Sequence, residues 1–422
     1  MKKTVSIITL GCRVNQYESC AVAEALTANG YEVVKNGVSD YYIVNTCTVT
    51  AESQRKSKQI VRRCAEKGKV LVMGCASQID PSFAEIENVI YVCGNREKLS
   101  VVDVLYADDA KCGNGVISMD NAPFEEMHIC GNSDLFSECR AFIKIQDGCN
   151  GKCTYCIIPK CRGSVRSREA DHIINEADRL IKKGYKEIIL TGIEVSAYNK
   201  IPLPQLIKSV SELKGLERLR LGSLTPNRIN VDFMETVSKC VNFMPHIHLS
   251  LQSCCDEILT AMKRPYKKTD IIDKVNLIRK YIPNCIITAD IIVGFPGETE
   301  EMFKETVDTL KELQLFHVHS FPYSEREGTP AAVMPNSVPK AIRSERNNCL
   351  ISEINIVKEN ILSSMYGKEI AVLVEKIKDG YAYGHTEEFI ESKLINKDYT
   401  VGSIVKAVGE SQENGILVAT PI

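Results

Sequence analysis

The amino-acid sequence predicts an α/β protein built from an N-terminal parallel α/β domain, an open (β/α)6 partial barrel and a small C-terminal all-β barrel. Three observations predict this architecture. Short β-branched runs alternate with amphipathic helical stretches through the first 125 residues, and the alternation resumes with a longer repeat from residue 141. After residue 365 the chain changes to short strand-like runs with glycine between them, which is typical of a small β-barrel.

The first predicted domain covers residues 1–125. Its predicted strands are residues 4–10, 31–34, 41–45, 69–73 and 89–92, and its predicted helices are residues 17–29 and 52–66. Strands that alternate with helices favour a parallel sheet. Residues 126–140 are predicted to be a linker, because this part of the chain is rich in turn-forming residues.

The second predicted domain, residues 141–364, contains six strand–helix units. Its predicted strands are residues 141–145, 187–191, 218–222, 246–252, 286–293 and 316–321, and a long helix over residues 340–364 leads out of it. Six units favour an open barrel over a complete eight-stranded one. The third predicted domain, residues 365–422, has predicted strands at residues 370–374, 381–385, 392–395 and 416–419.

Composition excludes several classes of protein. The chain of 422 residues is 44% hydrophobic and 25% charged, which is typical of a globular protein, and its net charge of −2 shows no overall basic excess. No apolar run reaches the roughly 18 residues of a membrane-spanning helix, so no membrane partner is expected. Residues 5–10 are too short for a signal peptide and favour a first strand, so we expect a cytoplasmic protein.

Three of the 18 cysteines, Cys149, Cys153 and Cys156, lie within eight residues directly after the first strand of the second domain. Three thiolates at this spacing can hold one face of a 4Fe–4S cluster and leave the fourth iron open for a ligand. Gly148 and Gly151 give the loop the backbone freedom that such wrapping needs. A zinc knuckle without its fourth ligand and chance clustering are the alternatives.

Three other cysteines, Cys12, Cys47 and Cys75, each follow a predicted strand of the first domain. The carboxyl ends of parallel strands meet at one edge of the sheet, where ligands bind in open α/β folds. The three thiols are therefore candidates for a second cluster, and three ordinary buried cysteines are the alternative. Cys93 follows another strand of the same sheet and is a rival ligand, although core packing is preferred for it.

The whole chain resembles the radical S-adenosylmethionine methylthiotransferases. The resemblance rests on the contexts of Cys12 (residues 9–19), Cys47 (residues 45–50) and Cys75 (residues 74–78), on the loop at residues 147–163, and on residues 251–253, 294–299 and 322–329. It implies that the C-terminal barrel is a TRAM module. It also implies two 4Fe–4S clusters, one on Cys12, Cys47 and Cys75 and one on Cys149, Cys153 and Cys156, with no catalytic residue beyond these ligands.

The resemblance further implies the chemistry. S-adenosyl-L-methionine binds the open iron at Cys149, Cys153 and Cys156, and its reductive cleavage gives a radical that removes hydrogen from the substrate. A second S-adenosyl-L-methionine methylates sulfur held at the other cluster. A low-potential electron donor such as flavodoxin or ferredoxin and a sulfur donor are the implied partners.

Contacts to the cofactor are predicted at two strand ends. Gly192 and Glu194 lie where this superfamily meets the methionine amine, and Gly294 and Gly297 would allow close approach of backbone to the cofactor. A surface carboxylate at Glu194 and a plain strand–helix turn at residues 294–297 are the alternatives. His246 and His248 share a face of one strand, and packing or polar lining is preferred over metal binding there.

The cysteine contexts resemble the subgroup that acts on N6-threonylcarbamoyladenosine at position 37, in the anticodon stem-loop of tRNA. Methylthiolation of isopentenyladenosine or of an aspartate in a ribosomal protein is the alternative, and a two-cluster electron carrier or sulfur donor is the alternative of another class.

Residues 366–422 hold six Lys and nine Asp or Glu, which favours a protein substrate. Three basic clusters are candidates for RNA contact, with solvated helix faces as the alternative: Arg55, Lys56, Lys58, Arg62 and Arg63; Arg162, Arg166 and Arg168; and Lys263, Arg264, Lys267 and Lys268. Cys161, Cys254 and Glu194 depart from the family pattern.

Overall fold

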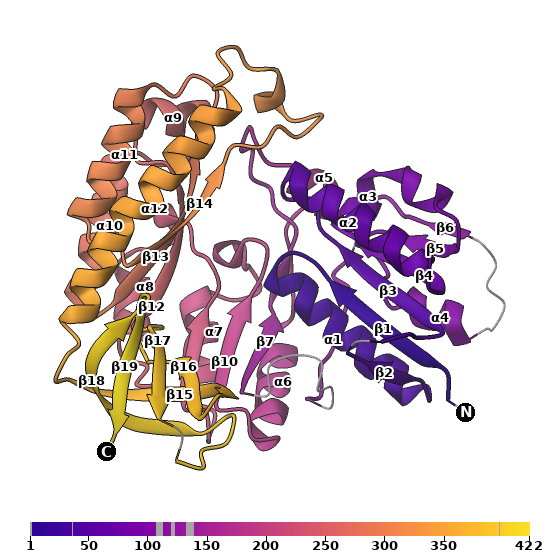
Figure 1. The fold of residues 1–422 in the computed structure, drawn as a ribbon, viewed down its shortest axis with the longest axis horizontal. Coiled ribbons are helices and arrows are strands. Elements are labelled where there is room, and N and C mark those ends of the chain that lie inside the picture. The colour runs from indigo at the N-terminus through magenta and orange to yellow at the C-terminus, as the bar shows by residue number, and fades with distance from the viewer. Residues whose placement is uncertain (1, 36, 107–112, 120–122, 132–138, 396) are drawn as a thin grey trace.

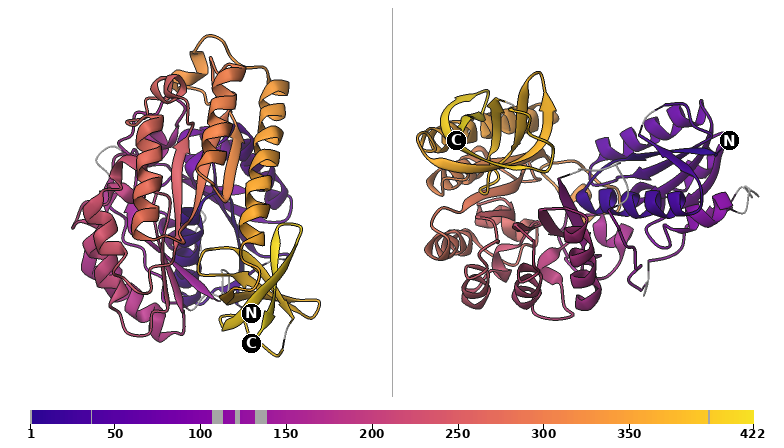
Figure 2. Two further views of the ribbon diagram at one scale, coloured as in Figure 1. Left: turned by 90° about the vertical axis from the view of Figure 1, so that its left-hand side faces the viewer. Right: turned by 90° about the horizontal axis from the view of Figure 1, so that it is seen from below.

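A computed structural model describes residues 2–35, 37–106, 113–119, 123–131, 139–395 and 397–422, and it has the three parts that the sequence predicts (Figure 1). We call them the N-terminal region, the partial barrel and the C-terminal barrel. The C-terminal barrel rests on the partial barrel, and the N-terminal region lies at the other end of the molecule (Figure 2). Within the described residues, no helix is long and apolar enough to cross a membrane.

The N-terminal region is a parallel sheet with strand order β2-β1-β3-β4-β5-β6. Its strands are β1 (Thr4–Thr9), β2 (Glu32–Val34), β3 (Tyr41–Thr46), β4 (Lys69–Gly74), β5 (Val89–Cys93) and β6 (Gly113–Gly115). Its helices are α1 (Arg13–Ala28), α2 (Ala51–Ala65), α3 (Cys75–Ile79), the 3-10 helix η1 (Pro81–Glu85) and α4 (Ser100–Tyr106). The predicted strands of this region are confirmed, and β6 is an addition to them.

Both faces of this sheet are covered, because alternate residues of each strand point to opposite sides. Ile43 of β3 packs in the cluster that holds Tyr17 of α1, whereas its neighbour Tyr42 packs with Val61 of α2. β3 is buried along its whole length as a result. The carboxyl edge of the sheet is left as the place where a ligand can approach.

The partial barrel consists of two parallel three-stranded sheets, β11-β10-β7 and β12-β13-β14. The bridges Leu219–Phe243 and Leu224–Leu249 join β11 to β12, so the six strands form one open (β/α)6 wall, as predicted. The strands are β7 (Arg140–Lys144), β10 (Glu187–Thr191), β11 (Arg218–Leu221), β12 (His246–Gln252), β13 (Ile286–Val293) and β14 (His317–Pro322), and a short pair β8 (Gln146–Asp147) and β9 (Arg166–Ser167) follows β7.

Helices cover the outside of this wall (Figure 2). They are α6 (Ala170–Lys182), α7 (Leu203–Ser211), α8 (Val231–Val237), α9 (Asp256–Ala261), α10 (Lys268–Tyr281), α11 (Glu300–Glu312) and α12 (Lys340–Ser363), with the 3-10 helices η2 (Val195–Ala197), η3 (Pro226–Arg228) and η4 (Pro330–Val333). The short helix α5 (Ile158–Arg162) instead packs against α3 of the N-terminal region. α1 of the N-terminal region packs against β7, which is an edge strand of the wall. The two regions therefore meet at the open side of the barrel.

The C-terminal part is a closed barrel with strand order β15-β16-β17-β19-β18. Its strands are β15 (Glu369–Lys378), β16 (Tyr381–His385), β17 (Glu391–Ile395), β18 (Ile404–Glu413) and β19 (Ile416–Pro421). The sequence predicted a barrel but not β18, although β18 closes it by pairing with β15 and β19. The domain boundaries given above stay a prediction, and part of the predicted linker lies outside the described residues.

Two arginines of β11 fasten the C-terminal barrel to the partial barrel. Arg218 donates to the carbonyls of Ala371 and His385, and Arg220 donates to the carbonyls of Thr386 and Glu387, all at 2.7–3.0 Å. Both guanidinium groups are buried, and Arg220 also pairs with Glu187 at 3.0 Å. The end of β16 and the segment after it are thereby held against the barrel wall.

We predict that Arg220→Met loosens this attachment, because it leaves two carbonyls and the Glu187 carboxylate short of a donor. The free energy of unfolding should fall by about 2–5 kcal/mol, and trypsin should release the C-terminal barrel faster than from the wild type. Arg228→Met is the matched control, because Arg228 is exposed. Equal digestion rates for the two variants would contradict the prediction.

Candidate functional site

Cys12, Cys47 and Cys75 lie at the carboxyl edge of the N-terminal sheet, as predicted. Cys12 is the N-cap residue of α1, Cys47 directly follows β3, and Cys75 begins α3 directly after β4. A Cβ atom at Gly11 would lie 2.7 Å from the Sγ atom of Cys47, so the loop before Cys12 passes directly beside that thiol. The positive φ of 93° at Gly11 is a second reason for glycine there.

The three thiols of this edge act on one another electrostatically. Burial raises the pKa of Cys12, and the neighbouring Cys75 raises it further. Burial raises the pKa of Cys47 to about 11, with Cys75 and Cys12 both adding to the shift. The structure thus brings the three predicted cysteines together. Cys93 instead packs in the hydrophobic core behind the edge, which was the preferred interpretation for it.

Cys149, Cys153 and Cys156 lie on the loop between β8 and α5. A Cβ atom at Gly151 would lie 3.0 Å from the Sγ atom of Cys149 and 3.8 Å from that of Cys153, so the loop wraps around Gly151 and directs both thiols to one side. Gly148 has a φ of 72°, and a Cβ atom there would lie 2.0 Å from the carbonyl oxygen of Ser164. The loop conformation therefore requires glycine at position 148.

One arginine donates to a thiol of each group. Nη1 of Arg264 lies 3.2 Å from Sγ of Cys153, and Nε of Arg162 lies 3.2 Å from Sγ of Cys75. A donor to a ligand sulfur stabilises its thiolate and tunes the potential of a bound cluster. RNA contact by Arg162 and Arg168 is wrong, because both side chains are buried in ion pairs. Arg264, from another of the basic clusters, is directed toward Cys153.

Arg162 is the centre of a buried ionic network between the two regions. Its Nη1 atom lies 3.0 Å from carboxylate oxygens of both Glu18 and Asp147, and Lys98 and Lys144 also bind Glu18. These five residues are at most 4% exposed. Arg166 contacts Asp147 as well, at 3.6 Å, and Nε of Arg162 donates to Sγ of Cys75, so the network reaches the first group of cysteines.

Cys161 lies between the two groups of cysteines. It is fully buried and packs in one cluster with Cys75 and Ile157. Burial raises its pKa, and Cys75 and Cys156, one from each group, both influence it electrostatically. The short helix α5 therefore connects the two sets of thiols, with Cys156 before it and with Cys161 and Arg162 in its last turn.

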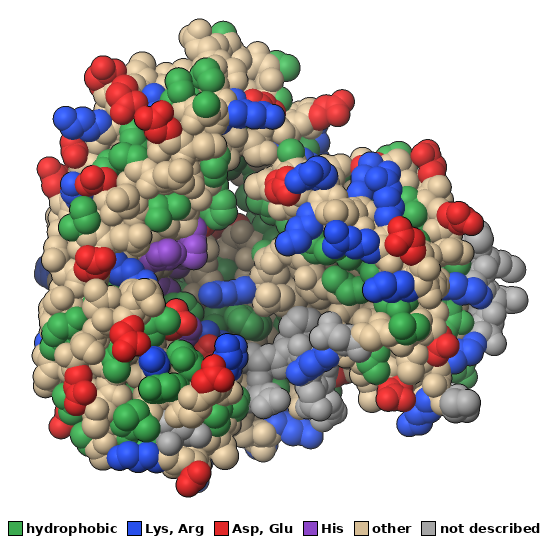
Figure 3. Space-filling view, in the orientation of Figure 1, with side chains coloured by type: hydrophobic (Ala, Val, Ile, Leu, Met, Phe, Trp, Pro, Cys, Tyr) green, Lys and Arg blue, Asp and Glu red, His purple; other side chains and the backbone are tan. Residues whose placement is uncertain are grey.

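A cavity of about 490 Å³ opens between the three parts of the protein (Figure 3). Its lining includes Cys12 and Arg13 of the N-terminal region, Gly192 and strand residues of the partial barrel, and Phe389 and Glu391 of the C-terminal part. Histidine side chains gather on its wall (Figure 3). Five of the seven histidines of the chain line it: His246, His248, His317, His319 and His385.

The predicted polar-lining role of His246 and His248 is confirmed. Both rings bond the hydroxyl of Thr288, at 3.0 and 2.8 Å, and Nε2 of His248 lies 3.2 Å from Asp290. Burial lowers the pKa of His246 well below its usual value and lowers that of His317 to about 4, so both rings are neutral near pH 7. The sequence analysis missed His317, His319 and His385, which come from two further strands.

The predicted cofactor contacts fall into two groups. Glu194 lies near the second cysteine loop: burial raises the pKa of Cys149, and the charge of Glu194 raises it further. The backbone N–H of Glu194 donates to Gln146 at 2.8 Å, and Gly192 lies against the same glutamine. At Gly294 a Cβ atom would lie 2.4 Å from the side chain of Arg343. Close packing against α12 thus explains Gly294, which favours the strand–helix turn interpretation at residues 294–297.

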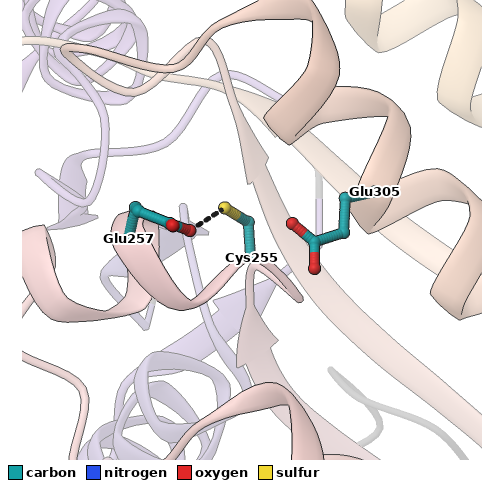
Figure 4. Close-up of side chains that lie close together, drawn as sticks. All are labelled: Cys255, Glu257 and Glu305. Carbon is teal, nitrogen blue, oxygen red and sulfur yellow. Dashed lines mark hydrogen bonds between the residues drawn. The ribbon is translucent and has the colours of Figure 1, made fainter.

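Cys255, Glu257 and Glu305 are the one group of described residues whose ligand atoms lie near enough together for a single metal ion (Figure 4). The thiol of Cys255 donates to Glu257 at 3.0 Å, and Glu305 already pairs with Lys268 at 2.6 Å. Cys255, Glu257 and Glu305 thus have hydrogen-bond or ion-pair partners within the protein, and their proximity does not require a metal ion. Cys254, which departs from the family pattern, is buried in the core.

Comparisons with known proteins agree with this geometry. Residues 4–94 match the Uncharacterized protein family UPF0004, and residues 143–310 match the Radical SAM superfamily. The chain is 34% identical to the threonylcarbamoyladenosine tRNA methylthiotransferase MtaB of Bacillus subtilis (96% of this chain, 93% of that protein) and 35% identical to that of Thermotoga maritima (93% and 92%). The chain belongs to the radical S-adenosylmethionine methylthiotransferases.

Other members of the family are also similar to it. A tRNA-2-methylthio-N(6)-dimethylallyladenosine synthase of Clostridium botulinum is 32% identical (99% of this chain, 93% of that protein). Among solved structures, the radical S-adenosylmethionine methyltransferase TsrM of Kitasatospora setae has a TM-score of 0.56 at 16% identity, covering 79% of this chain and 77% of that one, which confirms the fold.

Membership of this methylthiotransferase family implies S-adenosyl-L-methionine and a 4Fe–4S cluster, and the loop at residues 149–156 fits such a cluster. Its thiols lie to one side of a glycine-shaped loop, and the backbone N–H of Gly151 lies 3.2 Å from Sγ of Cys149. Arg264 offers a positive charge to the same group, which suits an anionic cluster.

We predict that Arg162→Met destabilises the protein by about 3–5 kcal/mol, because Glu18 and Asp147 would each lose a buried ion-pair partner. Urea denaturation followed by circular dichroism measures the change. Arg62→Met is the matched control on an exposed helix face, where we expect at most about 0.5 kcal/mol. A loss no larger than that of the control would show that the network does not hold the two regions together.

Proposed function

We propose that this methylthiotransferase attaches a methylthio group to C2 of N6-threonylcarbamoyladenosine at position 37 of tRNA. The observation that carries the proposal is that Cys161 and Arg162 of α5, directly after the Cys149 loop, contact Cys75 of the other group, whose member Cys12 lines the cavity. The relatives that share a third of its residues over nearly the full length support the substrate.

We infer that Cys149, Cys153 and Cys156 hold one 4Fe–4S cluster and that Cys12, Cys47 and Cys75 hold a second. Two three-thiol sites support an enzyme over an electron carrier, because carriers saturate their irons with four protein ligands. Helices α1 and α3 begin at or beside Cys12 and Cys75, so their N-terminal N–H groups favour negative charge at these sulfurs.

Each part of the chain then has a defined task. When bound, S-adenosyl-L-methionine and a reduced cluster supply a radical that removes hydrogen, and the second cluster holds the sulfur that is transferred. Gly192 and Glu194 lie at the boundary between the Cys149 loop and the cavity, where they would orient the methionine end of the cofactor. Of the two glycines after β13, Gly294 packs against Arg343 of α12, and Gly297, which has open space beside it, would border the cofactor through its backbone. The neutral imidazoles of the wall would exclude bulk water from the reacting carbon.

The exposed face of α2 would bind the phosphates of the tRNA anticodon stem-loop. Lys56, Arg62 and Arg63 are exposed on it, and blue side chains gather on this part of the N-terminal region beside the hollow (Figure 3). Phosphate contacts of this kind position an RNA without reading its sequence. A low-potential electron donor, such as flavodoxin or ferredoxin, and a sulfur donor remain predicted partners.

We predict that anaerobic reconstitution loads about eight iron atoms on the wild type and about four on a variant with Cys12, Cys47 and Cys75 all changed to alanine. The chemistry of three-thiol sites is the reason, because each group holds one four-iron cluster. Cys93→Ala is the matched control and should keep about eight. Iron loss in the control, or full loading of the triple variant, would refute the assignment of the second cluster.

We expect tRNA from cells that lack the gene to contain N6-threonylcarbamoyladenosine but not its methylthio derivative. Nucleoside mass spectrometry measures both. The wild-type gene should restore the derivative, and a gene carrying Cys153→Ala should not. Retention of the methylthio nucleoside in the deleted strain would defeat the proposed substrate.

A further inference from the structure

Three buried arginines lie at the end of the cavity near β7 and β11, and one of them, Arg220, lines it. The arginines Arg140, Arg218 and Arg220 surround Glu187, at 3.2, 3.9 and 3.0 Å. Arg140 also pairs with Glu375, which His385 contacts as well. Glu187 and Glu375 contact these guanidinium groups directly, and the charges of Glu387 and Glu388 also act on Arg218.

Arg13 adds a fourth guanidinium group to this end of the cavity. It begins α1, directly after Cys12, and its side chain lines the cavity over the ring of Phe142, 5.5 Å from the ring centroid. Arg13 has no carboxylate within salt-bridge distance in the described part of the chain. The carboxylate whose charge acts on it, Glu187, is shared with three other arginines.

The remaining charged groups of the lining are compensated. Asp290 contacts His248, and Arg220 pairs with Glu187. Lys358 of α12 also lines the cavity, but the Glu391 carboxylate on the same wall acts on it. Arg13 is therefore the lining cation whose charge is least balanced by the protein itself.

We propose that Arg13 binds the carboxylate of the threonylcarbamoyl group and so selects the modified adenosine. This inference rests on the proposed function. A guanidinium group binds a carboxylate through two parallel hydrogen bonds, which fixes orientation as well as charge. Because Arg13 adjoins Cys12, a carboxylate bound there holds the base next to the cysteine group that carries the sulfur.

The chemistry of the competing nucleosides explains the selectivity. Unmodified adenosine and isopentenyladenosine have no anionic group, so either one would leave the Arg13 charge unpaired in a half-buried site. Leaving such a charge without a partner costs more than an ordinary hydrogen bond contributes. Arg13 is thus a specificity-determining residue that acts through binding.

The test compares three anticodon stem-loop RNAs that differ only at the target nucleoside: N6-threonylcarbamoyladenosine, its methyl ester, and adenosine. Binding to the cluster-loaded full chain is measured anaerobically. The wild type should prefer the carboxylate form over the ester and over adenosine by about 10- to 100-fold. Arg13→Met should bind all three RNAs alike, and Arg13→Lys should recover part of the preference because the charge is kept.

Three controls make the outcomes distinct. Iron content of Arg13→Met should equal that of the wild type, which separates the effect from damage at Cys12. Arg63→Met should weaken all three RNAs by the same factor, as a phosphate contact does. Lys358→Met should retain the preference, and loss of the preference in Lys358→Met together with its retention in Arg13→Met would overturn the assignment.

Failure of the inference and failure of the proposed function give different results. If the wild type methylthiolates the carboxylate RNA and Arg13→Met keeps the full preference, the role of Arg13 is refuted and the proposed function stands. If the wild type shows neither preference nor methylthiolation with that RNA, the proposed function fails and the inference fails with it.

Discussion

The contact between Arg162 and Cys75 is the interaction on which the rest of the site depends. The arginine comes from the loop that carries the second group of cysteines, and the thiol belongs to the first, so one hydrogen bond of 3.2 Å ties the two together. A fully buried guanidinium group is tolerated only when its partners are all in place, and those partners are supplied by both the N-terminal region and the partial barrel. The ionic network therefore sets the relative position of the two regions, and with it the separation of the two cysteine groups.

Periodicity made most of the fold predictable. Buried parallel strands such as β3 and β10 are apolar or β-branched along their length, and the helices between them show an apolar stripe. β18 escaped prediction because its outward positions carry Lys406, Glu410 and Glu413, so its apolar residues do not form a run. β6 consists of Gly-Asn-Gly and has no strand propensity; only pairing with β5 defines it.

The cysteines of the site were predictable because both groups follow predicted strands in the sequence. The cysteines that follow strand ends could be grouped because parallel strands share an edge. The burial of Arg162 and Arg168 could not be predicted from the sequence. It depends on their ion-pair partners Glu18 and Glu176, and Glu18 lies far from Arg162 along the chain. The group of five histidines that lines the cavity could not be predicted for a similar reason. These histidines come from β12, β14 and β16 and lie together only in the folded protein.

The closed C-terminal barrel has a consequence for biosynthesis. Phe389 and Glu391 form part of the cavity wall, yet they leave the ribosome after all six cysteines of the two groups. During translation all six cysteines are therefore synthesised before the cavity wall is complete. Iron and sulfur can therefore reach the thiols while that side of the cavity has no wall, and the C-terminal barrel adds the wall afterwards.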